Sequence, residues 1–180
     1  MTGPQADEKS VTAYLGLGSN LGDREANLRK ALSLLSRHMQ LVVVSSIYET
    51  EPWGYLAQPK FLNMACGVHT RLEPTELLGV LKQVEAQTGR TPTFRNGPRV
   101  IDIDILLYGD LVIESDSLVV PQRSIAKRPF TLVPLNEIAG DIVHPVLGAS
   151  IRQLLASSPG KEGVCLWGPP PALQDGRLAA

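Results

Sequence analysis

The sequence of 180 residues lacks features that several protein classes depend on. Its two cysteines, Cys66 and Cys165, are too few for a disulfide framework or a zinc cluster, and its three histidines lie far apart without the spacing of metal ligands. The net charge of −1 argues against binding duplex nucleic acid or a membrane surface by bulk electrostatics. No apolar run approaches the roughly 18 residues of a membrane span, and the N-terminus does not have the pattern of a signal peptide. We therefore expect a cytoplasmic protein that has neither nucleic acid nor a membrane as its partner.

Length and composition favour one domain with mobile ends. A chain of this size, 43% hydrophobic, can bury a core of its own without disulfides. Residues 1–10 are polar and without periodicity, and residues 157–180 are rich in proline, glycine and small side chains. We expect flexible tails at these two ends and a single domain at residues 11–156.

Strand and helix patterns alternate within that domain. Period-two or β-branched apolar runs predict strands, and apolar residues at helical spacing predict helices. The predicted strands lie at 11–17, 41–50, 61–70 and 100–109, and the predicted helices run through 28–39 and 74–88. This order, β-α-β-β-α-β, is typical of a ferredoxin-like split-βαβ α/β fold, with an antiparallel or mixed sheet. We expect the helices on one face of the sheet and the active site on the other.

The segment RVIDIDILL carries the strongest chemical signal. On a strand Ile101, Ile103, Ile105 and Leu107 would face one way and Asp102 and Asp104 the other, with Cα atoms of the two aspartates roughly 6.6 Å apart. Two adjacent carboxylates repel each other unless a cation lies between them, and Mg²⁺ favours a few carboxylate oxygens plus phosphate and water. The pattern indicates a magnesium site, although two solvated aspartates without a function remain an alternative.

The neighbouring segments suggest what such a site would bind. Arg90, Arg95 and Arg99 lie in a glycine- and proline-rich loop before the strand, and arginine forks match phosphate oxygens. Phe61 and Asn63 share the polar face of the third strand, where a ring and an amide suit a flat heterocycle. Ordinary exposed residues would explain either set taken alone.

A glycine-rich turn offers a competing interpretation. GLGSNLG follows the first strand and opens a helix, as dinucleotide-binding loops do. Its third glycine, Gly22, comes one position late, and the chain lacks successive parallel βαβ units. We favour a tight turn that lets a substrate or another backbone approach closely.

Five ordered strings carry a family resemblance: AYLGLGSNLGDREANL, SSIYETEPWG, QPKFLN, RNGPRVIDIDILLYG and FTLVPLNEIA. Across about Val11 to Pro145 the chain resembles the 6-hydroxymethyl-7,8-dihydropterin pyrophosphokinases of folate biosynthesis. The resemblance implies transfer of the β,γ-pyrophosphoryl unit of ATP to the pterin hydroxymethyl oxygen, which leaves AMP. ATP and a reduced pterin would be the substrates, two Mg²⁺ ions would assist, and we expect a monomer.

The resemblance also implies residue roles. Asp102 and Asp104 would bind the magnesium ions, and together with Arg90, Arg95 and Arg99 they would be catalytic. The pterin would be held by Thr50, Trp53, Phe61, Asn63 and Phe130, with the two phenylalanines sandwiching its ring. The nucleotide would be held by Lys82, Glu85, Arg90, Arg95, Arg99, Ile105 and Arg128.

The chain departs from the family pattern at the arginine loop and beyond it. Asn96 stands where the family usually has tryptophan, the loop is one residue short near Thr91, and Gln122 replaces an expected histidine. We expect Asn96 to leave the loop more mobile and its closure more dependent on arginine–phosphate contacts. A weakened homologue that only binds pterin or nucleotide is therefore an alternative. An RNA-binding module is a second one, but its sheet would need more aromatic residues than the 5% present.

Overall fold

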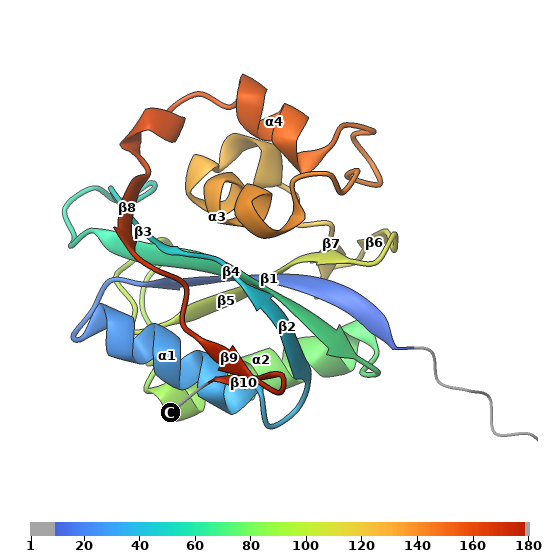
Figure 1. Ribbon diagram of the computed structural model, residues 1–180. Helices are drawn as coiled ribbons and strands as arrows, with labels where there is room; N and C mark the ends of the chain where they lie inside the picture. Colours follow the sequence, from blue (N-terminus) through green and yellow to red (C-terminus); the bar gives the residue numbers. More distant parts are fainter. Residues whose placement is uncertain (1–9, 179–180) are drawn as a thin grey trace, which may run out of the picture.

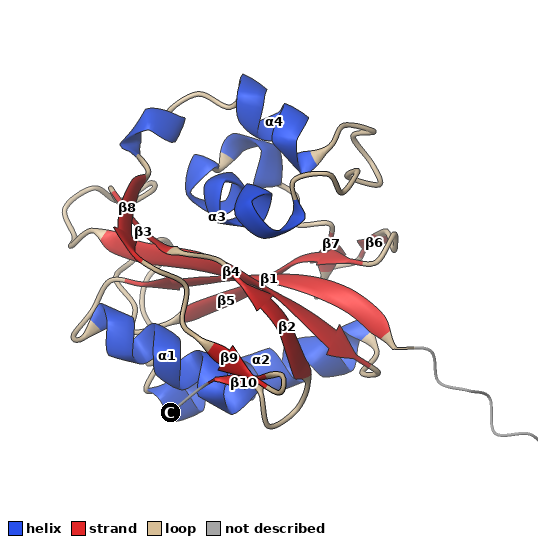
Figure 2. Cartoon of the chain, viewed as in Figure 1, coloured by secondary structure: helices blue, strands red, loops and turns tan. Residues whose placement is uncertain are grey.

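A computed structural model describes residues 10–178, so nearly all of the predicted N-terminal tail lies outside the described residues. A central antiparallel sheet separates two layers of helices (Figures 1 and 2). The sheet strands are β1 (Val11–Ser19), β2 (Gln40–Val44), β3 (Ile47–Thr50), β4 (Phe61–Thr70), β5 (Asp102–Tyr108) and β8 (Cys165–Gly168). The α-helices are α1 (Arg24–Leu35), α2 (Pro74–Thr88), α3 (Pro129–Ala139) and α4 (Ile151–Ser157). Two small hairpins are formed by β6 (Ile113–Glu114) with β7 (Val119–Val120) and by β9 (Leu173–Gln174) with β10 (Arg177–Leu178).

The strand order confirms the predicted fold class. The sheet runs β5-β1-β4-β3-β8, with β2 also paired to β4, and every pairing is antiparallel. Asp23 caps α1 through a hydrogen bond from Ala26 N–H at 3.0 Å, and Gly89 ends α2 with a φ of 116°. Helices α1 and α2 bury their apolar faces against one side of the sheet, as the helical spacing predicted.

The predicted strand 41–50 is two strands, β2 and β3. At the break, Ser45 N–H donates to the Ala65 carbonyl and the Ser45 hydroxyl accepts from Ala65 N–H, each at 2.9 Å. The next amide, Ser46 N–H, bonds to Glu137 of α3 instead of to β4. These side-chain hydrogen bonds replace the ladder locally, which the β-branched pattern could not reveal.

The opposite face of the sheet is less open than predicted. Leu132 and Leu135 of α3 form a second buried cluster with Leu106 and Leu107 of β5. The register between β1 and β5 shifts between Tyr14 and Leu15. Leu107 therefore packs in this second cluster, whereas the strand pattern predicted it on the same face as Ile105. The part of this face near the start of β5 is open beside α3, and the candidate site lies there.

The prediction of a flexible C-terminal tail at residues 157–180 is wrong for the part of it that the structure describes. Strand β8 extends the sheet by pairing with β3, and Leu173 and Leu178 of the last hairpin pack against the main core. Leu41 N–H also donates to the Gly176 carbonyl at 3.0 Å. The sequence pattern did not reveal these contacts, because the few apolar residues that make them are scattered in a segment rich in proline and glycine. Among the described residues, no helix is long and apolar enough to cross a membrane.

Candidate active site

Asp102 and Asp104 project from β5 on the open face, as predicted. Their side chains are 28% and 43% exposed, whereas Ile103 between them is buried. The cross-strand partners are Gly18 opposite Asp102 and Gly16 opposite Asp104. A Cβ atom at Gly16 would lie 3.2 Å from the Leu106 side chain, so this strand needs glycine for the close approach of its neighbours. This accounts for one glycine of the turn motif without a dinucleotide.

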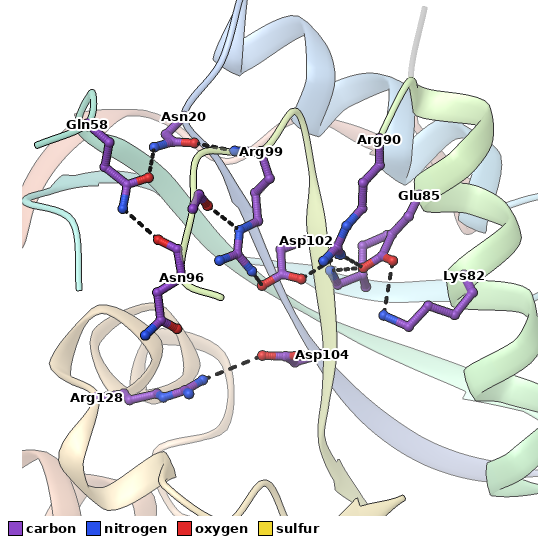
Figure 3. Close-up of polar contacts among 12 residues, drawn as sticks. Asn20, Gln58, Lys82, Glu85, Arg90, Asn96, Arg99, Asp102, Asp104 and Arg128 are labelled. Carbon is purple, nitrogen blue, oxygen red and sulfur yellow. Dashed lines mark hydrogen bonds and ion pairs between the residues drawn. The ribbon is translucent and has the colours of Figure 1, made fainter. Parts of the chain in front are cut away.

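Arginines surround this pair of carboxylates (Figure 3). Asp102 accepts from Arg90 Nη1 at 2.7 Å on Oδ1 and from Arg99 Nη1 at 2.9 Å on Oδ2. Arg128 Nη1 lies 3.6 Å from Asp104 Oδ2. The arrangement gathers positive charge around two acidic groups, which suits a metal–phosphate complex.

The electrostatics of Asp104 favour a bound cation. Partial burial, together with the nearby Asp102 charge, raises the pKa of Asp104 to about 6, and the charges of Arg128 and Lys82 limit the rise. A divalent cation would stabilise the ionised form of this carboxyl. No cluster of three or more His, Cys, Asp or Glu residues occurs in the part of the chain described by the structure. A two-carboxylate set still fits Mg²⁺, which takes its other ligands from water and phosphate.

A cavity beside the carboxylates gathers all five residues predicted to hold a heterocycle. It is lined by Thr50, Trp53, Phe61, Asn63 and Phe130. Asn63 Nδ2 donates to Thr50 Oγ1 at 2.7 Å, and both residues are buried. The Trp53 and Phe130 rings lie 5.9 Å apart between centroids, at an interplanar angle of 55°. Gly18 also borders this cavity, where a Cβ atom would lie 3.0 Å from Asn63 Oδ1.

A second groove, on the other side of Arg99, collects most of the residues predicted to bind nucleotide. It is lined by Lys82, Glu85, Arg90, Arg95 and Arg99 together with residues 91–94 and 96. Glu85 is buried and accepts from Lys82 at 3.0 Å, from Arg90 at 2.6 Å and from Ile103 N–H at 2.8 Å. It therefore orients Arg90. Arg128 lines the first cavity instead, and the Ile105 side chain is buried in the core, outside both linings.

Asn20 and Gln58 were missed by the sequence analysis and join the two loops of the site, 51–60 and 89–101 (Figure 3). The Asn20 carboxamide donates to Gln58 Oε1 at 2.9 Å and accepts from Arg99 N–H at 2.8 Å. Gln58 Nε2 donates to the Asn96 carbonyl at 2.8 Å. Asn20 is only 1% exposed, and a buried amide that saturates its hydrogen bonds in this way fixes the relative position of the loops. The only sequence signal was its place in the turn GSNLGD.

Comparisons with known proteins agree on one family. The profile of the 7,8-dihydro-6-hydroxymethylpterin-pyrophosphokinase (HPPK) family matches residues 14–140. The 2-amino-4-hydroxy-6-hydroxymethyldihydropteridine pyrophosphokinase of Bacillus subtilis is 45% identical over 157 residues, covering 86% of this chain and 89% of that protein. The Aquifex aeolicus protein of the same name is 41% identical, with 87% and 98% covered.

Longer proteins contain a similar region. The Dictyostelium discoideum folic acid synthesis protein FOL1 is 40% identical over 158 residues, but this chain spans only 24% of its length. A crystal structure of Plasmodium falciparum HPPK-DHPS matches 82% of this chain and 44% of that chain, with a TM-score of 0.67 and 18% identity. At that identity the match supports the fold alone.

Proposed function

Because this chain belongs to the 7,8-dihydro-6-hydroxymethylpterin-pyrophosphokinase family, we propose that the Asp102–Asp104 site transfers the pyrophosphoryl group of ATP to the hydroxymethyl oxygen of the dihydropterin, releasing AMP. The chain is an ATP-dependent pyrophosphokinase of folate biosynthesis. The observation that best supports the site is the position of the carboxylate pair. It borders the aromatic cavity, while the arginine-lined groove begins at Arg99, which both linings share.

Asp102 and Asp104 are the proposed ligands of two magnesium ions. Magnesium supplies charge neutralisation for the phosphates and makes the pterin hydroxyl more acidic. The two aspartates hold it on the open face, next to both substrates. The raised pKa of Asp104, about 6, supports this role because an ionised carboxylate there needs a cation nearby.

The arginines are the proposed phosphate ligands. Arg90 and Arg99 bind Asp102 through single Nη1 contacts, so further N–H groups on each guanidinium can reach phosphate oxygens. Arg95 is exposed in the same loop, and Lys82 borders the groove. Phosphoryl transfer depends on positioning and charge neutralisation, so these groups suffice without a general base.

The dihydropterin is the proposed occupant of the aromatic cavity. Phe61 and Phe130 supply ring faces, and Trp53 supports Phe130 from the side. Thr50 and Asn63 offer hydroxyl and amide groups to the polar edge of the heterocycle. All of these residues lie in one chain, which supports a functional monomer, and we retain the cytoplasmic location expected from the sequence.

The direct test supplies ATP, magnesium and 6-hydroxymethyl-7,8-dihydropterin and measures the release of AMP. We expect AMP in proportion to pterin consumed, and about a thousandfold slower release from Asp102→Ala. Asp110→Ala is the matched control, because Asp110 lies in the exposed turn after the same strand. Binding of both substrates without AMP would favour the alternative of a homologue that only binds.

A further inference from the structure

Arg24, the first residue of α1, contacts both ends of the 51–60 loop. Its Nη1 donates to Glu49 Oε1 and to the Lys60 carbonyl, each at 2.9 Å. Glu49 directly precedes Thr50, and Lys60 directly precedes Phe61. One guanidinium nitrogen therefore joins the chain entering the loop to the chain leaving it.

This contact lies where the two strands that carry the loop come together. Thr50 of β3 pairs with Phe61 of β4, and both side chains line the aromatic cavity. Lys60 Nζ also reaches Glu51 Oε1 at 2.7 Å, but that pair is largely exposed and is weak in water. The Arg24 and Glu49 side chains are 21% and 26% exposed, so solvent screens their charge-assisted bond less.

The C-terminal strand covers the same arginine. Trp167 of β8 places its ring centroid 5.0 Å from Arg24 Cζ, within the range of a cation–π contact. The indole Nε1 donates to Glu25 Oε2 at 3.4 Å, which links the ring to the next residue of α1. Strand β8 is held at this edge by pairing with β3, including Glu49 opposite Cys165.

We propose that Arg24 is a positioning residue for pterin binding, and that Trp167 acts through it by holding its guanidinium in place. The β3–β4 ladder pairs Thr50 with Phe61, and Arg24 holds the end of that ladder together through Glu49 and Lys60, which stabilises the placement of both side chains. This assignment rests on the proposed function, because it takes those two residues as pterin ligands. It also gives the C-terminal strand a part in substrate binding.

The test is steady-state kinetics of the full chain carrying Arg24→Met, which keeps the aliphatic stem and removes the donors. We expect the KM for dihydropterin to rise about tenfold, as for loss of one charge-assisted hydrogen bond, and the KM for ATP to stay within about twofold. Arg152→Met is the matched control, because Arg152 also forms an ion pair, with Asp141, but that pair is exposed and does not involve the 51–60 loop. It should leave both constants unchanged.

Trp167→Ala separates positioning from folding, because Trp167 is 49% exposed and its loss cannot empty the core. We expect a rise of about twofold to threefold in the pterin KM, and no further rise when Trp167→Ala is added to Arg24→Met. Amide hydrogen exchange should also quicken across residues 51–60 in Arg24→Met, but not in β1. An active wild type whose pterin KM is unmoved by Arg24→Met, or whose two KM values rise together, would overturn the assignment. An inactive wild type would instead count against the proposed function.

Discussion

Arg90 Nη1 lies 2.7 Å from Asp102 Oδ1, so a proposed phosphate ligand and a proposed magnesium ligand bind each other directly. Arg99 occupies the other oxygen of the same carboxylate at 2.9 Å. Magnesium at Asp102 must therefore compete with these two guanidinium contacts, whereas the remaining N–H groups of each arginine are open to phosphate. The two binding events are coupled through these ion pairs.

Arg99→Met should shift magnesium and nucleotide affinity in opposite directions. Removing the guanidinium frees Oδ2 of Asp102, so we expect Mg²⁺ alone to bind several-fold more tightly than to the wild type. The affinity for a non-hydrolysable ATP analogue should fall at least tenfold, because a charge-assisted phosphate contact is lost. Calorimetric titration measures both. Weaker magnesium binding in this variant would mean that Arg99 does not compete for Asp102.

The sequence predicted the faces of β5 as far as Ile105, and both loops, because these depend on local alternation and turn residues. Asp102 and Asp104 face the open side since Ile103 and Ile105 are drawn into the core. The Asn20–Gln58 contact joins residues 38 positions apart, and such a pairing has no local pattern. The C-terminal hairpin was missed because Leu173 and Leu178, its core anchors, are isolated among prolines and glycines. A strand or helix is predicted from apolar residues that repeat at regular spacing, and this segment is too short to show such a repeat.

Asp104→Asn should make the protein more stable while abolishing turnover. The pKa of Asp104 is raised to about 6, above the ordinary value of about 3.9, so the folded state binds more protons between those pH values. Wild-type stability therefore falls as pH rises from about 4 to about 6, and an asparagine escapes this loss. We expect a higher Tm for Asp104→Asn at pH 7.5 and a difference that shrinks toward pH 4.

Thermal unfolding of Asp104→Asn across this pH range checks the prediction, with Asp110→Asn as the surface control. The rate of AMP release should drop about a thousandfold in Asp104→Asn, because a neutral amide is a poor magnesium ligand. A Tm difference that is constant with pH would show that ionisation of Asp104 does not strain the fold. Wild-type turnover would remove Asp104 from the metal site.

Phe61→Ala and Asn63→Ala should weaken pterin binding without a comparable loss of ATP binding. Loss of ring stacking removes roughly 1 kcal/mol beyond the buried area, and loss of an edge hydrogen bond costs about 1–3 kcal/mol. Asn63→Ala also removes the donor to Thr50 Oγ1. Titration with the dihydropterin and separately with the ATP analogue distinguishes the two substrates. Unchanged pterin affinity in both variants would locate the heterocycle outside this cavity.

The backbone conformation at position 96 suits asparagine better than it would suit the tryptophan that is usual in the family. Its φ is 58°, in the left-handed region that asparagine and glycine tolerate and larger side chains disfavour by about 1 kcal/mol or more. Its amide also lies close to Gly54, where a Cβ atom would come within 2.7 Å of Asn96 Nδ2. The carbonyl of Asn96 is held by Gln58, so the loop is anchored through its main chain rather than by a buried ring.

Asn96→Gly should therefore keep near wild-type kcat and KM for ATP, because the backbone contact to Gln58 survives and glycine adopts this φ without cost. Asn96→Trp should lower kcat/KM for ATP several-fold, because the indole strains the left-handed residue and crowds Gly54. The sequence analysis instead expects Asn96 to leave the loop more mobile and its closure more dependent on arginine–phosphate contacts. Measuring both variants against ionic strength distinguishes the two ideas. A gain in kcat for Asn96→Trp, with a shallower salt dependence, would show that the loop leaves this conformation when it closes and that an indole can seal it.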